Sequence, residues 1–189
     1  LNIEQGSKQW LEWRLGGIGA SDVAALFGLS PYKTKRDLWF EKMGLGEPED
    51  ESKSYIFQKG HDVEAELRNI FSAHIKSDLN PTCFERDVIF RASLDGYDKA
   101  IGVFEAKLVG KDVLKKASTG EIPEHHRLQI QAQLHASDAD KAFWGGKLLK
   151  GKDSVVVEIG RDDKAIKDII KESLNFRSKG NWSSIKLTK

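Results

Sequence analysis

The sequence lacks several features that would assign it to a particular class of protein. Cys83 is the one cysteine among its 189 residues, which excludes a disulfide framework and a cysteine-rich zinc site and favours a reducing compartment. No apolar run approaches the roughly 20 residues that a helix needs to cross a bilayer. No signal-peptide pattern is present at its start. We therefore expect a cytoplasmic protein that does not act at a membrane.

An excess of charge of one sign is also missing. The chain has 30 basic and 29 acidic residues, a formal net charge of +1, so any site for a polyanion must be local. Candidate patches lie at 33–36, 111–116 and 147–152, although such clusters are more often solvated surface. Neither a phosphate-cradling P-loop nor an HExxH sequence is present, which argues against ATP use and against a zinc protease site.

Helical and strand patterns alternate along the chain. Helices are predicted over 7–15, 22–27, 35–43, about 55–75, 111–118, 123–136 and 162–179, and strands near 84–94, 101–108, 141–149 and 153–159. The polar, acidic segment 46–53 is interpreted as a loop. This order predicts one domain over 1–189 with an α/β fold: a mixed central sheet flanked by helices. Added helices before residue 50 precede an α/β core over 51–189.

Two of these helices have recognisable starts. Ser21 is predicted to cap the short helix that follows it, because a side-chain oxygen at this position accepts a free backbone N–H group. Thr34 and Asp37 have the spacing of a capping box at the start of the next helix. Both assignments come from local sequence alone.

Two acids and a lysine stand on two consecutive predicted strands. Successive side chains on a strand point to opposite faces, so Glu105 and Lys107 share a face, and a hairpin through 96–99 can bring Asp95 to the same point. A hard cation prefers carboxylate oxygens, and an ammonium group can act on the attacking water or on phosphate charge. The pattern is typical of a magnesium-dependent phosphodiester hydrolase. It also fits an ordinary solvated hairpin face.

Four segments in a fixed order carry a family resemblance. They read WLEWRLGGIGASD at 10–22, GHDVE at 60–64, ASLDG at 92–96 with EAK at 105–107, and QIQAQL at 129–134. Together they resemble the lambda exonuclease and YqaJ-type viral recombinase family of the PD-(D/E)XK nuclease superfamily. One departure is that Leu-Val-Gly at 108–110 replaces the Cys-Pro that follows the lysine in many relatives.

The resemblance implies a PD-(D/E)XK nuclease-like fold and a set of catalytic roles. Asp95 and Glu105 would ligate Mg²⁺, with Mn²⁺ as a substitute, and the backbone carbonyl of Ala106 would be a further ligand. Lys107 would orient or deprotonate the attacking water, the second of which requires a lowered pKa. Glu64 would hold a metal-bound water or a second ion, where the alternative is a routine exposed glutamate on a helix.

A glutamine and three phosphate-binding residues complete the implied site. Glutamines occupy 129, 131 and 133, and since they cannot all face one way on a helix, Gln131 is chosen as the catalytic one. Arg14, Ser21 and Ser93 would form a pocket for a terminal 5′-phosphate, through a guanidinium and hydroxyl donors. The alternatives are a surface arginine at Arg14 and a plain helix cap at Ser21.

The implied activity is the degradation of one strand of linear double-stranded DNA, in the 5′-to-3′ direction, from a 5′-phosphorylated end. The products would be mononucleotides and a 3′ overhang for phage-type recombination by single-strand annealing, in a bacterial cell or an infected host. The implied partners are double-stranded DNA ends, further copies in a ring-shaped homotrimer, and a single-strand annealing protein. Alternatives are a restriction or junction-resolving endonuclease and a non-catalytic DNA-binding subunit. Intact Asp95, Glu105 and Lys107 argue against the last.

Overall fold

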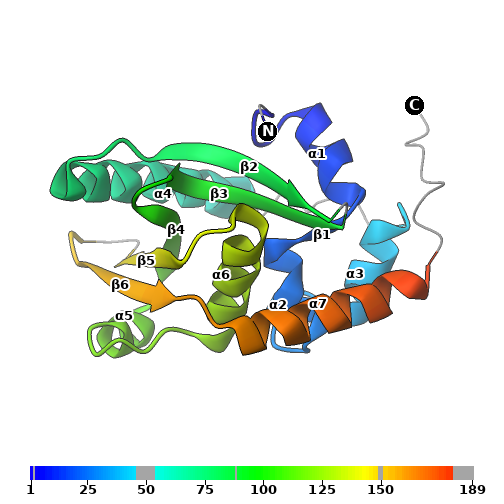
Figure 1. The fold of residues 1–189 in the computed structure, drawn as a ribbon. Coiled ribbons are helices and arrows are strands. Elements are labelled where there is room, and N and C mark those ends of the chain that lie inside the picture. The colour runs from blue at the N-terminus through cyan, green and yellow to red at the C-terminus, as the bar shows by residue number, and fades with distance from the viewer. Residues whose placement is uncertain (2, 46–53, 88, 149–150, 181–189) are drawn as a thin grey trace.

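The computed structural model describes residues 1, 3–45, 54–87, 89–148 and 151–180, and over 54–62 it describes the backbone only (Figure 1). A six-stranded sheet with parallel and antiparallel pairing lies at its centre, and helices cover it. The predicted α/β fold with a mixed central sheet is confirmed. The predicted loop at 46–53 lies outside the described residues. In the described part of the chain, no helix has the length and apolar character needed to span a membrane.

The helices follow the predicted order. They are α1 (Lys8–Leu15), α2 (Val23–Leu26), α3 (Lys35–Lys42), α4 (Ser54–Ile75), α5 (Lys111–Ala117), α6 (Glu124–Ser137) and α7 (Asp163–Ser178), with a 3₁₀ turn, η1 (Ala20–Asp22), before α2. The capping box between Thr34 and Asp37 is present at the start of α3. The predicted cap at Ser21 is wrong, because Ser21 lies inside η1. The carboxylate of Asp22 instead accepts the backbone N–H of Gly19 at 2.8 Å.

The strands are β1 (Ile18–Gly19), β2 (Asn80–Arg86), β3 (Phe90–Asp98), β4 (Gly102–Val109), β5 (Lys141–Leu148) and β6 (Ser154–Gly160). The single strand predicted near 84–94 is wrong, since β2 and β3 are separate antiparallel strands. The chain turns near Asp87, whose φ is 53°. Aspartate tolerates this left-handed conformation, so neither glycine nor proline marks the turn. Strand β1 is a second difference, because we predicted only helices before residue 50.

Strand β3 has different partners along its two edges. Strand β2 covers one edge over most of its length. On the other edge, β1 pairs in parallel with Phe90 and Arg91, and β4 pairs in antiparallel from Gly96 onward. Residues 92–95 therefore have no strand beside them on that edge in the described sheet. We call this opening of β3 between β1 and β4 the fork.

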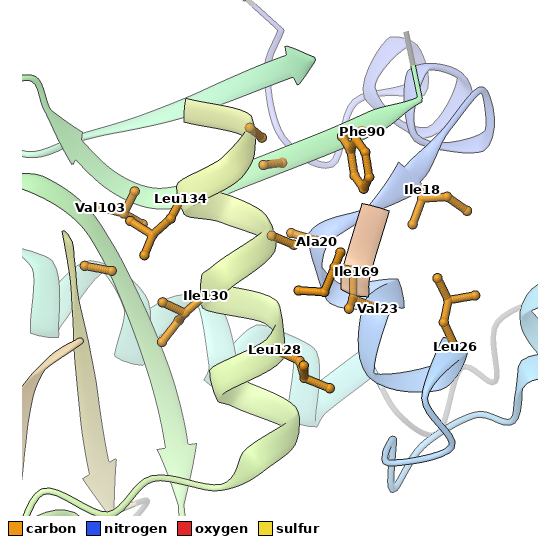
Figure 2. Close-up of a cluster of buried hydrophobic side chains, with 14 of the residues drawn as sticks. Ile18, Ala20, Val23, Leu26, Phe90, Val103, Leu128, Ile130, Leu134 and Ile169 are labelled. Atoms are coloured by element: carbon orange, nitrogen blue, oxygen red, sulfur yellow. The ribbon is translucent and has the colours of Figure 1, made fainter. Parts of the chain in front are cut away.

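Two apolar clusters hold the layers together. Helix α6 lies at the centre of the larger one, where Leu128, Ile130 and Leu134 pack between the sheet and the N-terminal segment (Figure 2). Helix α4 packs in the second cluster, and the rings of Phe71 and Phe104 stack with centroids 5.1 Å apart. Each buried side chain of this size contributes about 1.5–3 kcal/mol. The two helices thus fix the strands that border the fork.

Candidate active site

Asp95 reaches across the fork from an irregular point of β3. Its strand has one more residue here than β2, so that Asp95 and Gly96 together oppose Pro81 in a β-bulge. Bulges redirect side chains. The Oδ2 atom of Asp95 accepts the backbone N–H of Ala106 at 2.7 Å. A side chain thus takes the place of a backbone partner where β3 and β4 separate.

Helix α4 supports the same bulge from behind. The Nη1 atom of Arg68 donates to the backbone carbonyl of Asp95 at 2.7 Å. Gly96 leaves room for this contact, because a Cβ atom there would lie 3.0 Å from the Cβ of Leu79 and 3.3 Å from the Cδ of Arg68. The glycine after Asp95 therefore serves close packing against α4.

Glu105 is held on β4 by donors from α6. Its carboxylate is almost fully buried, with 2% of the residue exposed. The Nε2 atom of Gln129 donates to Oε1 at 2.6 Å, and that of Gln133 donates to Oε2 at 2.5 Å. Lys107 forms an ion pair with Oε1. Both carboxylate oxygens are thus fixed, and a buried charge of this kind needs such partners.

The choice of Gln131 as the glutamine of this site is wrong. Its Nε2 atom donates to the carbonyl of Gly160 at 2.9 Å, and its Oε1 atom accepts the backbone N–H of Asp162 at 2.8 Å. Side chains four apart on a helix share a face, whereas those two apart do not. Gln129 and Gln133 therefore face the sheet, and Gln131 joins α6 to the start of α7.

The structure brings the predicted acids together. Burial raises the pKa of Asp95 well above its ordinary value, and the nearby charges of Glu105 and Glu64 raise it further. Lys107 and the Ala106 N–H act in the opposite direction without cancelling the effect. Glu64, from α4, therefore lies near enough to affect the pKa values of both Asp95 and Lys107. The site has more negative charge than its one ammonium group offsets.

Lys107 is a cation in this arrangement. Burial alone would lower its pKa, but Glu105, Asp95 and Glu64 together raise it above its ordinary value. Of the two roles expected for Lys107, deprotonating the water requires a lowered pKa, whereas in the metal-free protein the pKa is raised. Orienting the water or neutralising phosphate charge does fit.

The residues of the fork suit a hard divalent cation. Asp95 and Glu105 offer carboxylate oxygens beside the backbone of Ala106, and a cation would relieve the charge crowding that raises the pKa of Asp95. Mg²⁺ is usually held by one or two carboxylates and keeps several waters. The described residues contain no group of three or more His, Cys, Asp and Glu side chains that could hold a metal ion, so a cation at the fork would depend on two carboxylates, a backbone carbonyl and water.

The residues predicted to bind phosphate also converge. The Nη2 atom of Arg14 donates to the Oγ of Ser21 at 3.2 Å. Its guanidinium lies over the ring of Trp10, 4.7 Å from the centroid, and the Nε1 of Trp10 donates to the Oγ of Ser93 at 2.7 Å. Arg14 is therefore part of an ordered cluster rather than an isolated surface arginine. Trp10 joins it to Ser93.

Sequence reasoning missed four residues of these two clusters: Trp10, Arg68, Gln129 and Gln133. The spacing of Gln129 and Gln133 was a usable signal, since residues four apart on a helix can bind the same group. Arg68 lies one helical turn after Glu64, on the same side of α4. Nothing in the sequence distinguished Trp10 from a core aromatic residue.

Solved structures share this fold. The chain is similar to an alkaline exonuclease (LHK-Exo) from Laribacter hongkongensis, with a TM-score of 0.75 and 19% identity over 92% of each chain. It is also similar to a phage-related exonuclease from Haemophilus somnus 129PT, with a TM-score of 0.62 and 17% identity over 86% of this chain and 92% of that one. The fold of this chain is thus the α/β fold of the alkaline exonuclease LHK-Exo.

The sequence comparisons give the family. The model of the YqaJ-like viral recombinase domain matches residues 9–140. An uncharacterized protein, YqaJ of Bacillus subtilis (strain 168), is 31% identical over 184 residues, which cover 93% of this chain and 56% of that protein. The chain belongs to the YqaJ-like viral recombinase domain family. It spans little more than half the length of this relative.

Proposed function

We propose that the protein is a metal-dependent deoxyribonuclease that degrades one strand of linear double-stranded DNA from a 5′-phosphorylated end. The observation that carries this proposal is the arrangement along β3. Ser93, which accepts a hydrogen bond from Trp10 in the Arg14–Ser21 cluster, and Asp95, which lies near the charges of Glu105 and Glu64, are two residues apart, which on a strand is about 6.6 Å. A terminal phosphate at the Arg14–Ser21 cluster would place the next phosphodiester near Asp95. This supports release of single nucleotides.

The chemistry follows from the residues of the fork. When bound, Mg²⁺ or Mn²⁺ would supply Lewis-acid stabilisation of the phosphate oxygens and an activated water. Asp95 and Glu105 would hold the ion, together with the Ala106 carbonyl. Gln129 and Gln133 keep the Glu105 carboxylate in one orientation. The Lys107 ammonium would add positive charge where negative charge develops on the scissile phosphate.

Family membership supports a role in phage-type recombination. In this role the remaining 3′ overhang would pass to a single-strand annealing protein, and a ring-shaped homotrimer would keep the enzyme on its substrate. A ring suits a chain with a net charge of only +1, because enclosure replaces strong electrostatic attachment. Mass measurement of the native protein in solution tests the trimer.

A single substrate set tests the activity. Linear duplexes with a 5′-phosphate, linear duplexes with a 5′-hydroxyl, and covalently closed circles are incubated with the protein and Mg²⁺, and the products are sized. We expect mononucleotides from phosphorylated ends, slower release from hydroxyl ends and intact circles. Cleaved circles would identify an endonuclease instead. Glu105→Ala provides the inactive control, and full activity in that variant would refute the site.

A further inference from the structure

A fully buried carboxylate lies directly beneath the Arg14–Ser21 pair. Asp22 and Lys42 have no exposed side-chain surface, and the Oδ2 of Asp22 lies 2.7 Å from the Nζ of Lys42. Lys33 contacts Oδ1 at 2.8 Å, and the Nη2 of Arg14 lies 3.8 Å from the same oxygen. Charged groups are rarely buried to this degree unless they are paired. One acid thus faces three cations.

The contacts of Asp22 and Lys42 extend to both parts of the phosphate-binding pair. The Oδ2 of Asp22 accepts the backbone N–H of Gly19 at 2.8 Å and so fixes the turn that carries Ser21. The Nζ of Lys42 donates to the backbone carbonyl of Arg14 at 3.0 Å and so fixes the end of α1. The end of α1, which carries Arg14, and the turn that carries Ser21 are thus joined by the buried ion pair.

The cluster also leaves positive charge at the surface. Glu41 pairs with Lys33 at 2.8 Å, so two carboxylates face three cations and one positive charge is uncompensated. The Arg14 side chain is 28% exposed, whereas those of Asp22 and Lys42 are not exposed. Burial alone would raise the pKa of Asp22, but Lys42, Lys33 and Arg14 more than offset this and hold it below its ordinary value. Asp22 is therefore ionised at neutral pH.

Stability alone is a weak explanation for this arrangement. A buried ion pair can often be replaced by apolar residues of similar size without loss of stability, because desolvation costs offset the attraction. Holding a guanidinium and a hydroxyl at a fixed separation, however, requires directional bonds. Phosphate binding depends on such preorganised donors.

We propose that Asp22 and Lys42 are positioning residues that hold Arg14 and Ser21 in register for a terminal phosphate monoester, without touching it. This inference rests on the proposed function and extends it to residues below the surface. It predicts that the buried pair controls discrimination between phosphorylated and hydroxyl ends. It further predicts little effect on the chemical step in the fork.

The test compares Lys42→Met, Asp22→Asn and the charge-balanced double variant Asp22→Asn/Lys42→Met with wild type. The double variant removes both charges together, so no unpaired ion stays buried, and thermal unfolding verifies that it folds. Lys35→Met is the matched control, because Lys35 is on the same helix and pairs with Glu172 instead. Lys42→Arg keeps a cationic donor at this position and should therefore retain part of the preference for 5′-phosphorylated ends.

Two measurements are made on each variant. The first is kcat/KM on 5′-phosphorylated and 5′-hydroxyl duplexes; the second is fluorescence anisotropy of the same duplexes in EDTA. We expect the preference for phosphorylated ends to fall about tenfold or more, as for a charged hydrogen-bond donor that is no longer held. The kcat on hydroxyl ends should stay within about threefold of wild type, since the fork is intact.

The outcomes separate this inference from the proposed function. A folded double variant that keeps the wild-type phosphate preference in both measurements would overturn the positioning role and leave the nuclease proposal standing. A wild-type protein that cuts DNA but treats both ends alike would remove the phosphate site itself. Loss of preference in Lys35→Met as well as in Lys42→Met would mean that the effect is not specific to the buried pair, and the inference would fail.

Discussion

Asp95 and Ala106 are joined across the fork, where the carboxylate of one accepts the backbone N–H of the other at 2.7 Å. This bond lies where the backbone pairing of β3 and β4 stops, at Gly96 and Phe104. The carboxylate therefore has a hydrogen-bond donor in the backbone of β4 and also lies near the negative charges of Glu105 and Glu64. Its ionisation should affect stability and metal binding together.

Asp95→Asn should stabilise the metal-free protein at neutral pH. The pKa of Asp95 is raised on folding, so between the unfolded value of about 3.9 and the folded value the native state binds more protons and stability falls as pH rises. The loss is about 1.4 kcal/mol for each unit by which the pKa is raised. Asparagine can still accept the Ala106 N–H without carrying charge.

Urea unfolding in EDTA at pH 5 and pH 8 measures this effect. The wild type should lose more stability than Asp95→Asn between the two values. Added Mn²⁺ should then raise the unfolding midpoint of the wild type and have little effect on the variant. Parallel pH dependence in the two proteins would contradict the charge crowding described for the fork.

Gln133→Leu should lower the catalytic rate, whereas Gln131→Leu should lower the stability of the fold. The first removes a donor to Glu105, so we expect kcat to fall at least about tenfold, with DNA binding retained. The second removes two bonds between α6 and the start of α7 and should lower the free energy of unfolding by about 1–3 kcal/mol. Its rate per folded molecule should not change. Nuclease assays paired with urea unfolding distinguish the two, and equal rates would contradict the assignment.

The pH–rate profile should contain no ionisation from Lys107 acting as a base. Burial would lower its pKa, but Glu105 and Asp95 raise it above its ordinary value in the metal-free protein, and we expect it to stay protonated during the reaction. Lys107→Met should lower kcat about 100-fold through loss of positive charge. The shape of the profile between pH 7 and pH 10 should be the same in variant and wild type. An inflection present in the wild type and absent from the variant would restore the role of Lys107 as a base.

His126 should make the protein sensitive to mild acid. Burial, with the charges of Lys107 and His125, lowers its pKa to about 3, and its Nδ1 atom is buried without a hydrogen-bond partner. The unfolded state then binds more protons below about pH 6.5, so stability is fully present above that value and falls by up to about 1.4 kcal/mol per pH unit below it. His126→Phe should flatten this dependence between pH 4 and 6.5. Replacing the exposed His74 by alanine is the control.

The sequence was informative where a pattern is local. The long helices and most strands follow from periodicity, and strand alternation with a predicted hairpin placed Asp95, Glu105 and Lys107 at one point. The choice of Gln131 as the glutamine of the site was wrong, because α6 is buried on nearly all sides from Ile130 to Ser137. A helix without an exposed face has no hydrophobic periodicity to show which residues meet the sheet, so the four-residue spacing of Gln129 and Gln133 was the one signal for them.

Tertiary contacts account for the remaining differences. The bulge at Asp95 and Gly96 depends on how many residues β2 places opposite β3, which neither strand specifies alone. The ion pair of Asp22 with Lys42 joins residues of separate helices, and a lysine on a short helix gives no indication that it will be buried. The sequence likewise does not distinguish Arg14 from an exposed helical arginine, because its contacts with Trp10 and Ser21 form only in the folded structure.

The fork has a consequence for product length. The segment that carries Ser21 and the strand that carries Glu105 both attach to β3, at its opposite ends. Under the proposed function, the backbone of β3 therefore sets the distance between the site that binds the 5′-phosphate and the site that cleaves the phosphodiester bond. An insertion between Ser93 and Asp95 should therefore change the size of the excised unit.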